Sequence, residues 1–372
     1  MATGGGRNKQ RRFSGSDAPP VPEDETIRYR VTIALDATYS IGEALSGVGL
    51  YSRQILSGLA ESQPETRFDF CYRLHRFTRA RGEALGNNVR RRLLIEPLWP
   101  RGADLFHGLN QRLPRIPMRR SVSTFHDLFV LTDEYSTTEF RARFAAQARD
   151  AAARSDAIIA VSAFTREQVI NLLGVEGARV FIVHHGIREL MLPAVAREKV
   201  ILNVGAVQKR KNIQRLVEAF EGVDPDWRLV LAGSAGYGSA EILERIARSP
   251  ARDRILVTGY VSPQELAGWY ARAKIFAFPS LDEGFGMPVL EAMQAGIPVL
   301  TSNRSALPEV AGDAALLVDP EDTSGIGRAL CSLTKNEELA RDLMRRGAAR
   351  AQGFTWGKAV RETWEVYRKL LG

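Results

Sequence analysis

The chain has 372 residues, a formal net charge of +8 and an apolar fraction of 45%, which is ordinary for a folded globular protein. Its length suggests two or three domains of about 150 residues each. No window holds the run of about 18 apolar residues that a membrane-spanning helix needs, and the N-terminus has no apolar signal core. We therefore expect neither an integral membrane protein nor a secreted one.

The positive charge and the cysteines bear on partners and compartment. A basic chain can favour nucleic acid or an anionic membrane surface. No nucleic-acid motif is present and the basic residues are spread along the sequence, so we expect no nucleic-acid partner. Cys71 and Cys331 fall in a strand-like and a helix-like segment, where buried core thiols are expected. Such thiols favour a reducing cytoplasm, with peripheral contact at the inner membrane face left open.

Residues 1–27 are rich in Gly, Ser, Pro and Arg and contain almost no large apolar side chain. A segment of this kind buries too little surface to order itself, so it predicts a disordered basic tail. The basic side chains of this segment, Arg7, Lys9, Arg11 and Arg12, would allow contact with anionic lipid.

An α/β domain is predicted over residues 28–192. It opens with a strand at Arg30–Asp36, a glycine-bearing loop at 37–48 and a helix whose apolar stripe runs from Leu50 to Leu59. This layout suits a turn that approaches phosphate, although the third glycine of a dinucleotide fingerprint is absent. Further strands are expected at Phe68–Tyr72, Leu93–Glu96, Asp104–His107, Val122–Phe125, Ala157–Val161 and Val180–His184.

Helices are expected between these strands at Glu139–Arg154 and Ala163–Leu173, with Ser162 capping the second. The alternation of strands and helices predicts a mainly parallel sheet that is covered on both faces.

A linker at 193–199 precedes a second α/β series over residues 200–354. Its predicted strands are Val200–Val204, Arg228–Ala232, Ile255–Thr258, Ile275–Phe278, Val299–Thr301 and Ala315–Val318. Its predicted helices are Asn212–Phe220, Ala240–Arg248, Pro263–Arg272, Pro288–Gln294, Ser324–Thr334 and Glu337–Ala351. A last helix is predicted at Trp356–Leu371, within a crossover segment 355–372, and Thr355 is the expected cap. Its apolar stripe is Trp356, Val360, Trp364, Tyr367 and Leu371.

The stretch Phe276–Pro320 carries the most specific pattern. A short buried strand leads into a glycine-bearing loop, and Pro288 then opens a helix, where proline is tolerated because the first helical N–H has no partner. The glycines let backbone N–H groups approach a ligand, and the helix N-terminus favours phosphate. Glu283 in the loop and Glu291 on the helix offer carboxylates to hydroxyls at two ends of a ligand. This arrangement suits a sugar joined through a diphosphate to a nucleoside.

This stretch resembles the signature of the retaining glycosyltransferases of GT-B fold, in glycosyl transferases group 1 or family 4, which carry a Glu-x7-Glu motif. The matching residues are Glu-Gly-Phe-Gly-x-Pro-x-x-Glu-Ala-Met from Glu283, Ala-Gly-x-Pro-Val from Ala295, and Leu-Pro-Glu-Val-Ala-Gly-Asp-Ala-Ala from Leu307. The resemblance implies two Rossmann-like domains facing across a cleft, with the C-terminal helix crossing back to the N-terminal domain. Within the family, the pattern looks like bacterial mannosyl- or rhamnosyltransferases of polysaccharide assembly.

Arg210 and Lys211 follow a predicted strand and open a helix, which is where α/β sheets bind ligands. The family has a matching Arg-Lys-Asn whose basic residues contact the diphosphate, whereas Lys209 is expected at the surface. The resemblance also implies that Glu291 binds the ribose, that Glu283 lies nearest the donor sugar and that His126 points at that sugar. We therefore predict Glu283, His126, Lys211 and Arg210 as catalytic residues. Predicted donor contacts besides Glu291 are Gly47, Gly49, Asp127, Gly259, Tyr260, Val261, Gly284, Phe285, Gly286 and Met287.

No metal site and no cofactor are predicted, apart from the nucleotide diphosphate sugar that serves as donor substrate. The spacing Asp224-Pro225-Asp226 is typical of a turn and lies far in sequence from the glycine loops. The expected acceptor is a glycan or a lipid-linked glycan read by the N-terminal domain. Two alternatives stay open, a sugar-nucleotide epimerase of the same fold and a non-catalytic nucleotide-sugar-binding subunit.

Overall fold

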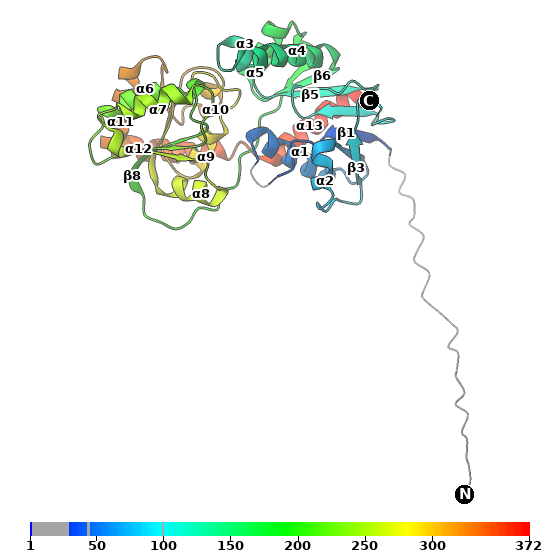
Figure 1. Cartoon of the computed structure of the whole chain (residues 1–372), viewed down its shortest axis with the longest axis horizontal. Helices are drawn as coiled ribbons and strands as arrows, with labels where there is room; N and C mark the ends of the chain where they lie inside the picture. Colours follow the sequence, from blue (N-terminus) through cyan, green and yellow to red (C-terminus); the bar gives the residue numbers. More distant parts are fainter. Residues whose placement is uncertain (2–29, 43–44, 99) are drawn as a thin grey trace.

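The computed structural model describes residues 1, 30–42, 45–98 and 100–372. The predicted tail at 1–27 lies outside the described residues apart from its first residue, as do positions 43 and 44 of the predicted glycine loop. Figure 1 shows two α/β halves side by side, with the N-terminal half carrying the blue to green elements and the C-terminal half the green to orange ones.

The N-terminal half is built on a seven-stranded sheet in the order β3-β2-β1-β4-β5-β6-β7 among the described residues. Every neighbouring pair in this sheet is parallel, as the sequence predicts. The strands are β1 (Thr32–Asp36), β2 (Arg67–Arg73), β3 (Val89–Leu94), β4 (Leu105–Gly108), β5 (Ser121–Phe125), β6 (Ala157–Ala160) and β7 (Val180–Ile182).

The edge strand β3 lies several residues before the predicted position, Leu93–Glu96. Three successive arginines hide its strand pattern in the sequence, and two of them, Arg90 and Arg92, pair with Asp69 on β2 at 2.7 and 3.4 Å. Charged side chains are common on edge strands because they discourage pairing with other chains.

The helices of this half are α1 (Gly47–Ser62), α2 (Leu74–Ala80), α3 (Phe129–Thr132), α4 (Thr138–Arg154) and α5 (Ala163–Leu173). Ser162 caps α5 as predicted, accepting the backbone N–H of Thr165 at 3.0 Å. The sequence missed α2 and α3, because α2 buries little beyond Ala80 and α3 has four residues. The glycines expected in a loop at Gly47 and Gly49 lie instead in the first turn of α1, which Ser46 caps.

The C-terminal half has a six-stranded parallel sheet in the order β10-β9-β8-β11-β12-β13 among the described residues. Its strands are β8 (Glu198–Val204), β9 (Arg228–Ala232), β10 (Ile255–Gly259), β11 (Ala273–Phe278), β12 (Val299–Ser302) and β13 (Leu316–Val318). The strand β8 begins inside the segment 193–199 that was expected to be a linker.

The helices of the second half are α6 (Ile213–Glu221), α7 (Ser239–Ala247), α8 (Pro263–Arg272), α9 (Met287–Gln294), α10 (Leu307–Ala311), α11 (Thr323–Lys335) and α12 (Glu337–Ala351). Ser262 and Glu265 form a capping box at the start of α8, where Pro263 occupies the first turn. The five-residue α10 was not predicted, because it is too short to show a helical period.

The last helix, α13 (Trp356–Leu371), crosses back to the N-terminal half, where Figure 1 shows it in red beside α1 and β1. The predicted apolar stripe faces this half. Val360 and Tyr367 are buried in one core with Tyr51 and Leu59 of α1. The fit is tight, since a Cβ on Gly58 would lie 2.5 Å from Val360.

The two cysteines differ in their surroundings. Cys71 on β2 is buried, as predicted. Cys331 on α11 is half-buried, so the prediction of a core thiol is wrong there, because the residue lies at the margin where α11 packs on α6. None of the described helices combines the length and apolar character needed to cross a bilayer.

Candidate active site

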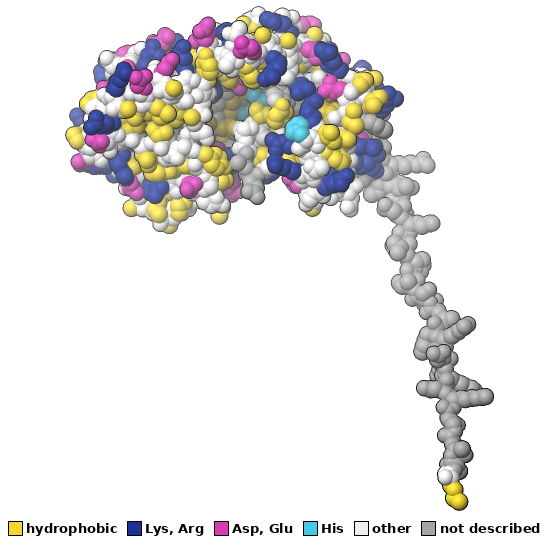
Figure 2. All heavy atoms as spheres, viewed as in Figure 1, with side chains coloured by type: hydrophobic (Ala, Val, Ile, Leu, Met, Phe, Trp, Pro, Cys, Tyr) yellow, Lys and Arg dark blue, Asp and Glu magenta, His cyan; other side chains and the backbone are white. Residues whose placement is uncertain are grey.

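A cavity of about 890 Å³ opens between the two halves, and Figure 2 shows the surface hollowed there. Both halves contribute to its walls. The N-terminal half supplies the start of α1, the end of β5 and the segment after β7, and the C-terminal half supplies the carboxyl ends of its strands and the loop before α9. The ionisable residues of the lining are Arg53, His126, Asp127, His185, Arg188, Arg210, Lys211, Tyr260, Glu283 and Glu291.

Glu283 lies between two cations in this cavity. Lys211 Nζ is 2.6 Å from Oε1 of Glu283, and the Arg210 guanidinium is 2.9 Å from Oε2. All three side chains are buried, whereas Lys209, one residue earlier, is exposed, as the sequence predicted. Asn212 holds this basic turn in place by donating to the carbonyl oxygens of two distant loops.

The cations set the charge of the pair and its surroundings. Burial raises the pKa of the Glu283 carboxyl, but Arg210 and Lys211 outweigh burial and bring that pKa down to about 2. The carboxylate is therefore ionised, and the three side chains together carry one surplus positive charge. The cations also lie over aromatic rings, Arg210 at 4.2 Å from Phe129 and Lys211 at 4.4 Å from Phe278.

Two aspartates face the same cluster. Burial raises the pKa of Asp127 to about 7, with Arg210 opposing the shift and Glu283 adding to it. Burial likewise raises the pKa of Asp282 to about 6, against a hydrogen bond from Thr132. Asp127 was predicted as a donor contact and does line the cavity, whereas Asp282 was not singled out.

Glu291 lies further along the cavity on α9. Its Oε2 accepts a hydrogen bond from the Tyr270 hydroxyl at 2.9 Å, and Arg188 Nε is 3.9 Å from its Oε1. Burial raises the pKa of Glu291, and Arg188 and Tyr270 work against that shift. Sequence reasoning missed Arg188, which follows β7 in the chain without a local motif to mark it.

The loop from Gly284 to Met287 passes very close to the N-terminal half. A Cβ on Gly284 would lie 1.8 Å from the carbonyl oxygen of His126, so only glycine fits there. Gly286 has a φ of +102°, in the region that favours glycine. The whole predicted loop, including Phe285, therefore lines the cavity, next to the N-terminus of α9.

The two predicted glycines of α1 differ. Gly47 lines the cavity and faces Met287 of α9, whose Cε would lie 2.9 Å from a Cβ added to this glycine. Gly49 is absent from the lining, because it packs under the backbone of Tyr39. The structure therefore does not bring Gly49 to the cavity wall, although its neighbours Val48 and Leu50 line it.

His126 and His185 lie side by side at the floor of the cavity, with Nδ1 of the first 3.3 Å from Nε2 of the second. Nε2 of His126 is 3.0 Å from the carbonyl oxygen of Leu109, and burial lowers the pKa of His126 to about 4. The imidazole is therefore neutral at neutral pH. Sequence reasoning treated His185 as structural, and its place in the lining is the result of tertiary packing.

The far wall of the cavity is mostly apolar. Tyr260 and Val261 line it as predicted, while Gly259, with a φ of +70°, ends β10 just outside the lining. Residues missed by the sequence reasoning lie beside them. They are Ala232, Gly233, Ser234, Pro263 and Leu266. An apolar wall of this kind suits a nucleobase.

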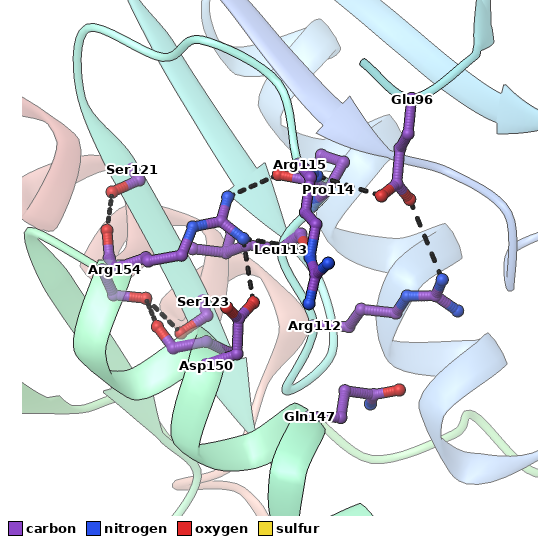
Figure 3. Close-up of polar contacts among 12 residues, drawn as sticks. Glu96, Arg112, Leu113, Pro114, Arg115, Ser121, Ser123, Gln147, Asp150 and Arg154 are labelled. Atoms are coloured by element: carbon purple, nitrogen blue, oxygen red, sulfur yellow. Dashed lines mark hydrogen bonds and ion pairs between the residues drawn. The ribbon is translucent and has the colours of Figure 1, made fainter. Parts of the chain in front are cut away.

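The segment that follows β4 is fixed to the N-terminal half, as Figure 3 shows. The Arg154 guanidinium donates to the carbonyl oxygens of Leu113, at 3.5 Å, and Pro114, at 2.5 Å. Glu96 accepts the backbone N–H of Arg115 at 3.1 Å. The segment starts at Leu109, whose carbonyl oxygen lies 3.0 Å from Nε2 of His126, so it lies beside the cavity.

Two parallel-sheet domains, with buried cations and carboxylates in the cavity between them, have the layout of a GT-B glycosyltransferase. Residues 192–350 match the family model for glycosyl transferases group 1, and residues 54–189 match that for glycosyltransferase family 4. The chain is 30% identical, over 72% of its length and 74% of the relative, to O-antigen chain mannosyltransferase B of Escherichia coli. The chain therefore belongs to the glycosyltransferase family of group 1 and family 4 domains that these models describe.

Solved structures share the fold. The sucrose-phosphate synthase from Thermosynechococcus elongatus superposes with a TM-score of 0.71 at 22% identity, covering 92% of this chain and 99% of that one. Anabaena Alr3699/HepE, in complex with UDP and glucose, superposes with a TM-score of 0.67 at 16% identity, covering 91% of this chain and 99% of that one. These likenesses agree with the GT-B architecture expected from the sequence.

Proposed function

We propose that this glycosyltransferase is a retaining, metal-independent enzyme that moves a mannosyl group from a nucleotide diphosphate sugar to an acceptor hydroxyl. The mannosyl assignment is supported by the similarity to the Escherichia coli O-antigen mannosyltransferase, and a rhamnosyl group is the second choice. The acceptor is a glycan or a lipid-linked glycan in polysaccharide or glycolipid assembly.

The observation that carries the proposal is the cluster of Glu283 with Lys211 and Arg210 inside the cleft. Its two cations exceed its one carboxylate, and they lie at the carboxyl end of β8, where parallel sheets bind ligands. A diphosphate placed here gains contacts with both cations and with the N-terminus of α9. Glu291 is then near enough to accept from the ribose hydroxyls, and Glu283 from the hexose.

The proposed reaction breaks the bond between the anomeric carbon and the diphosphate oxygen and forms a bond from that carbon to the acceptor oxygen on the same face. The acceptor proton passes to the departing diphosphate, which leaves as a nucleoside diphosphate. Lys211 and Arg210 stabilise the negative charge that develops on the leaving group, and the Glu283 carboxylate steadies the positive charge at the sugar. Neutral His126 is proposed to contact the donor sugar without supplying charge, with Leu109 and His185 holding its two ring nitrogens.

The metal-independent part of the proposal follows from these cations, which offer the diphosphate the charge neutralisation that a divalent ion would otherwise give. Asp224 and Asp226 form a turn at the surface, where Asp226 pairs with Lys199 at 2.7 Å, so this pair is not in the cleft. No other cofactor is proposed. We also propose that the enzyme is cytoplasmic and makes peripheral contact with an anionic membrane.

Donor screening tests the proposal. GDP-mannose, UDP-glucose, dTDP-rhamnose and ADP-glucose are titrated calorimetrically with EDTA present, and transfer is followed with the linkage assigned by NMR. We expect one donor to bind and a product with the anomeric configuration of that donor to form without added metal. A requirement for a divalent ion, or a product with inverted configuration, would contradict the proposal. Isomerisation of a donor in the absence of any acceptor would favour the epimerase.

A further inference from the structure

The N-terminus of α5 in one half of the molecule holds the donor loop of the other half. The hydroxyl of Ser162 donates to the carbonyl oxygen of Gly284 at 2.7 Å, and that of Thr165 donates to the same oxygen at 3.1 Å. Both hydroxyls are fully buried. The Gly284 carbonyl therefore has both of its lone pairs satisfied by side chains from the opposite domain.

A second contact fixes α5 itself against the C-terminal half. Glu309 on α10 receives the backbone N–H of Ala163 on both carboxylate oxygens, at 2.9 and 2.8 Å, and that of Phe164 at 3.4 Å. His184 Nε2 lies 2.7 Å from the same carboxylate. A carboxylate from one domain thus caps an 11-residue helix of the other, where the helix dipole favours negative charge.

The two contacts converge on one short segment. Glu283 donates its backbone N–H to Ser305 at 3.1 Å, and its carbonyl accepts the backbone N–H of Ala306 at 3.2 Å, just before α10. The carboxylate of Glu309 and the peptide of Gly284 therefore belong to one hydrogen-bonded unit that faces the start of α5. Figure 1 shows α5 and α10 on the facing sides of the two halves.

We propose that Ser162 and Thr165, held in place by Glu309, are positioning residues that fix the Gly284 peptide across the cleft. They thereby set the position of the Glu283 carboxylate and of the backbone N–H groups at 285–287 relative to the donor sugar. This inference rests on the proposed function, since it assigns these groups to the sugar end of the donor. The nucleoside end is bound elsewhere, by Glu291 and the apolar wall.

The division between sugar end and nucleoside end gives a specific test. Thr165→Val removes the hydroxyl at nearly constant volume, and Thr165→Ser keeps it. In the Ser162→Ala/Thr165→Val double variant we expect kcat to fall about 10- to 100-fold, because small misplacements of reacting groups cost this much. The affinity for the free nucleoside diphosphates GDP, UDP, dTDP and ADP, measured by calorimetry, should stay within about twofold of the wild-type value.

Two controls and one further variant separate positioning from damage. Thr165→Ser should keep wild-type turnover. Thr137→Ala removes the N-cap of α4, where the Thr137 hydroxyl accepts the backbone N–H of Phe140 within the same half, so it should also leave turnover unchanged. Glu309→Gln should lower kcat in the same direction as the double variant. Thermal melting checks that each variant is folded.

Hydrogen exchange gives a readout that does not depend on catalysis. The amides of residues 284–287 should exchange faster in the double variant than in the wild type, and at the wild-type rate in Thr165→Ser. Unchanged exchange in the double variant would overturn the inference, as would turnover within about threefold of the wild type. A wild-type enzyme that transfers no sugar would instead refute the proposed function, and the exchange data would still decide whether α5 holds the loop.

Discussion

At the scale of single residues, the site is dominated by a buried carboxylate between two cations. Burying charges is costly, and removing one member of such a cluster leaves the others without compensation. Glu283 lowers the cost of burying Arg210 and Lys211 by pairing with both of them. Its low pKa of about 2 keeps these ion pairs intact at any physiological pH. Both cations are thereby held at the cavity wall, in a position to contact a diphosphate.

The first prediction concerns Lys211. Lys211→Gln keeps an N–H donor near Glu283 but removes the charge, so we expect transfer to fall about 10²- to 10³-fold, as is typical when one preorganised group at a developing charge is lost. Steady-state kinetics with the donor found by screening measures the loss. The matched control is Lys209→Gln, because Lys209 is the exposed neighbour in the same turn. Equal activity in the two variants would contradict the role given to Lys211.

Asp127 gives a prediction about pH. Burial raises its pKa to about 7 from an ordinary value of 3.8, so the folded protein retains a proton that the unfolded chain releases at lower pH. Its stabilising contribution is therefore complete below about pH 4 and is lost as the pH rises through 7. Asp127→Asn stays neutral throughout. The variant should match the stability of the wild type near pH 4 and be more stable than the wild type by about 1–3 kcal/mol at pH 8.5. This gain is smaller than the full pKa shift of Asp127 would give, because the residue is half-buried.

Urea denaturation at the two pH values checks this expectation. The exposed Asp253→Asn variant is the control, since its side chain is 89% exposed and the same substitution there should leave stability unchanged at both pH values. A variant of Asp127 that is less stable than the wild type at pH 8.5 would show that the carboxylate form is needed for the fold.

The residues of the site divide into those that a local pattern marks and those that it does not. Glu283, Glu291 and the Arg-Lys pair occur within short segments with glycines and strand ends around them, so their place in the cleft was predictable. Arg188 and His185 were not, because they follow a short strand and reach the cleft only when the two halves pack together.

At the scale of elements, the cleft is where two helix N-termini meet. The start of α1, capped by Ser46, faces the start of α9, and Gly47 comes close to Met287. Two positive helix ends in one cavity add to the charge of the basic turn. The close approach is possible because Gly47 carries no side chain where it faces Met287.

The third prediction uses one of these glycines. Gly284→Ala would place a Cβ 1.8 Å from the His126 carbonyl oxygen, which is backbone and cannot rotate away. The loop must then separate from the N-terminal half, so we expect transfer to fall by at least about 100-fold, with a cost in stability of about 1–3 kcal/mol or more. Gly222→Ala is the control, because an added Cβ there meets nothing within 4 Å. Activity near the wild-type level in Gly284→Ala would show that the loop has room to move.

Most elements were predictable from period and caps, and the exceptions have physical reasons. Long helices such as α8 and α13 have both an apolar stripe and a capping residue, and their bounds match the prediction. The short α3 and α10 lack a full period, and β3 is concealed by arginines that its position at the sheet edge allows. Tertiary contacts, rather than local preference, hold these three.

At the scale of the whole molecule, α13 makes the two halves interdependent. It follows α12 of the C-terminal half, yet its apolar side completes the core around β1 and α1. The amphipathic stripe was visible in the sequence, but a stripe does not say which surface it covers. The structure shows that surface, and the resemblance to the family had implied it.

A buried hydrogen-bonded chain links α13 to the floor of the cleft. The Tyr367 hydroxyl lies 2.5 Å from Nδ1 of His107, whose Nε2 is 2.8 Å from Oγ1 of Thr124. The Thr124 hydroxyl is in turn 2.9 Å from the hydroxyl of Tyr51, whose ring contacts His126. Burial lowers the pKa of His107 to about 3, so this imidazole is neutral and needs a partner on each nitrogen.

The last prediction follows from that chain. Tyr367→Phe keeps the ring but leaves Nδ1 of His107 buried without a hydrogen bond, so the free energy of unfolding should fall by about 1–3 kcal/mol. Tyr367→Ala also empties part of the core and should cost about 3–5 kcal/mol. Glu365→Ala on the exposed side of α13 is the control and should change stability by less than about 0.5 kcal/mol. The helix α13 follows the C-terminal half in sequence but packs in the core of the N-terminal half. Calorimetry should therefore show the unfolding transition of the N-terminal half moving to lower temperature in the Tyr367 variants. A shift confined to the C-terminal half would mean that α13 is stabilised chiefly by that half.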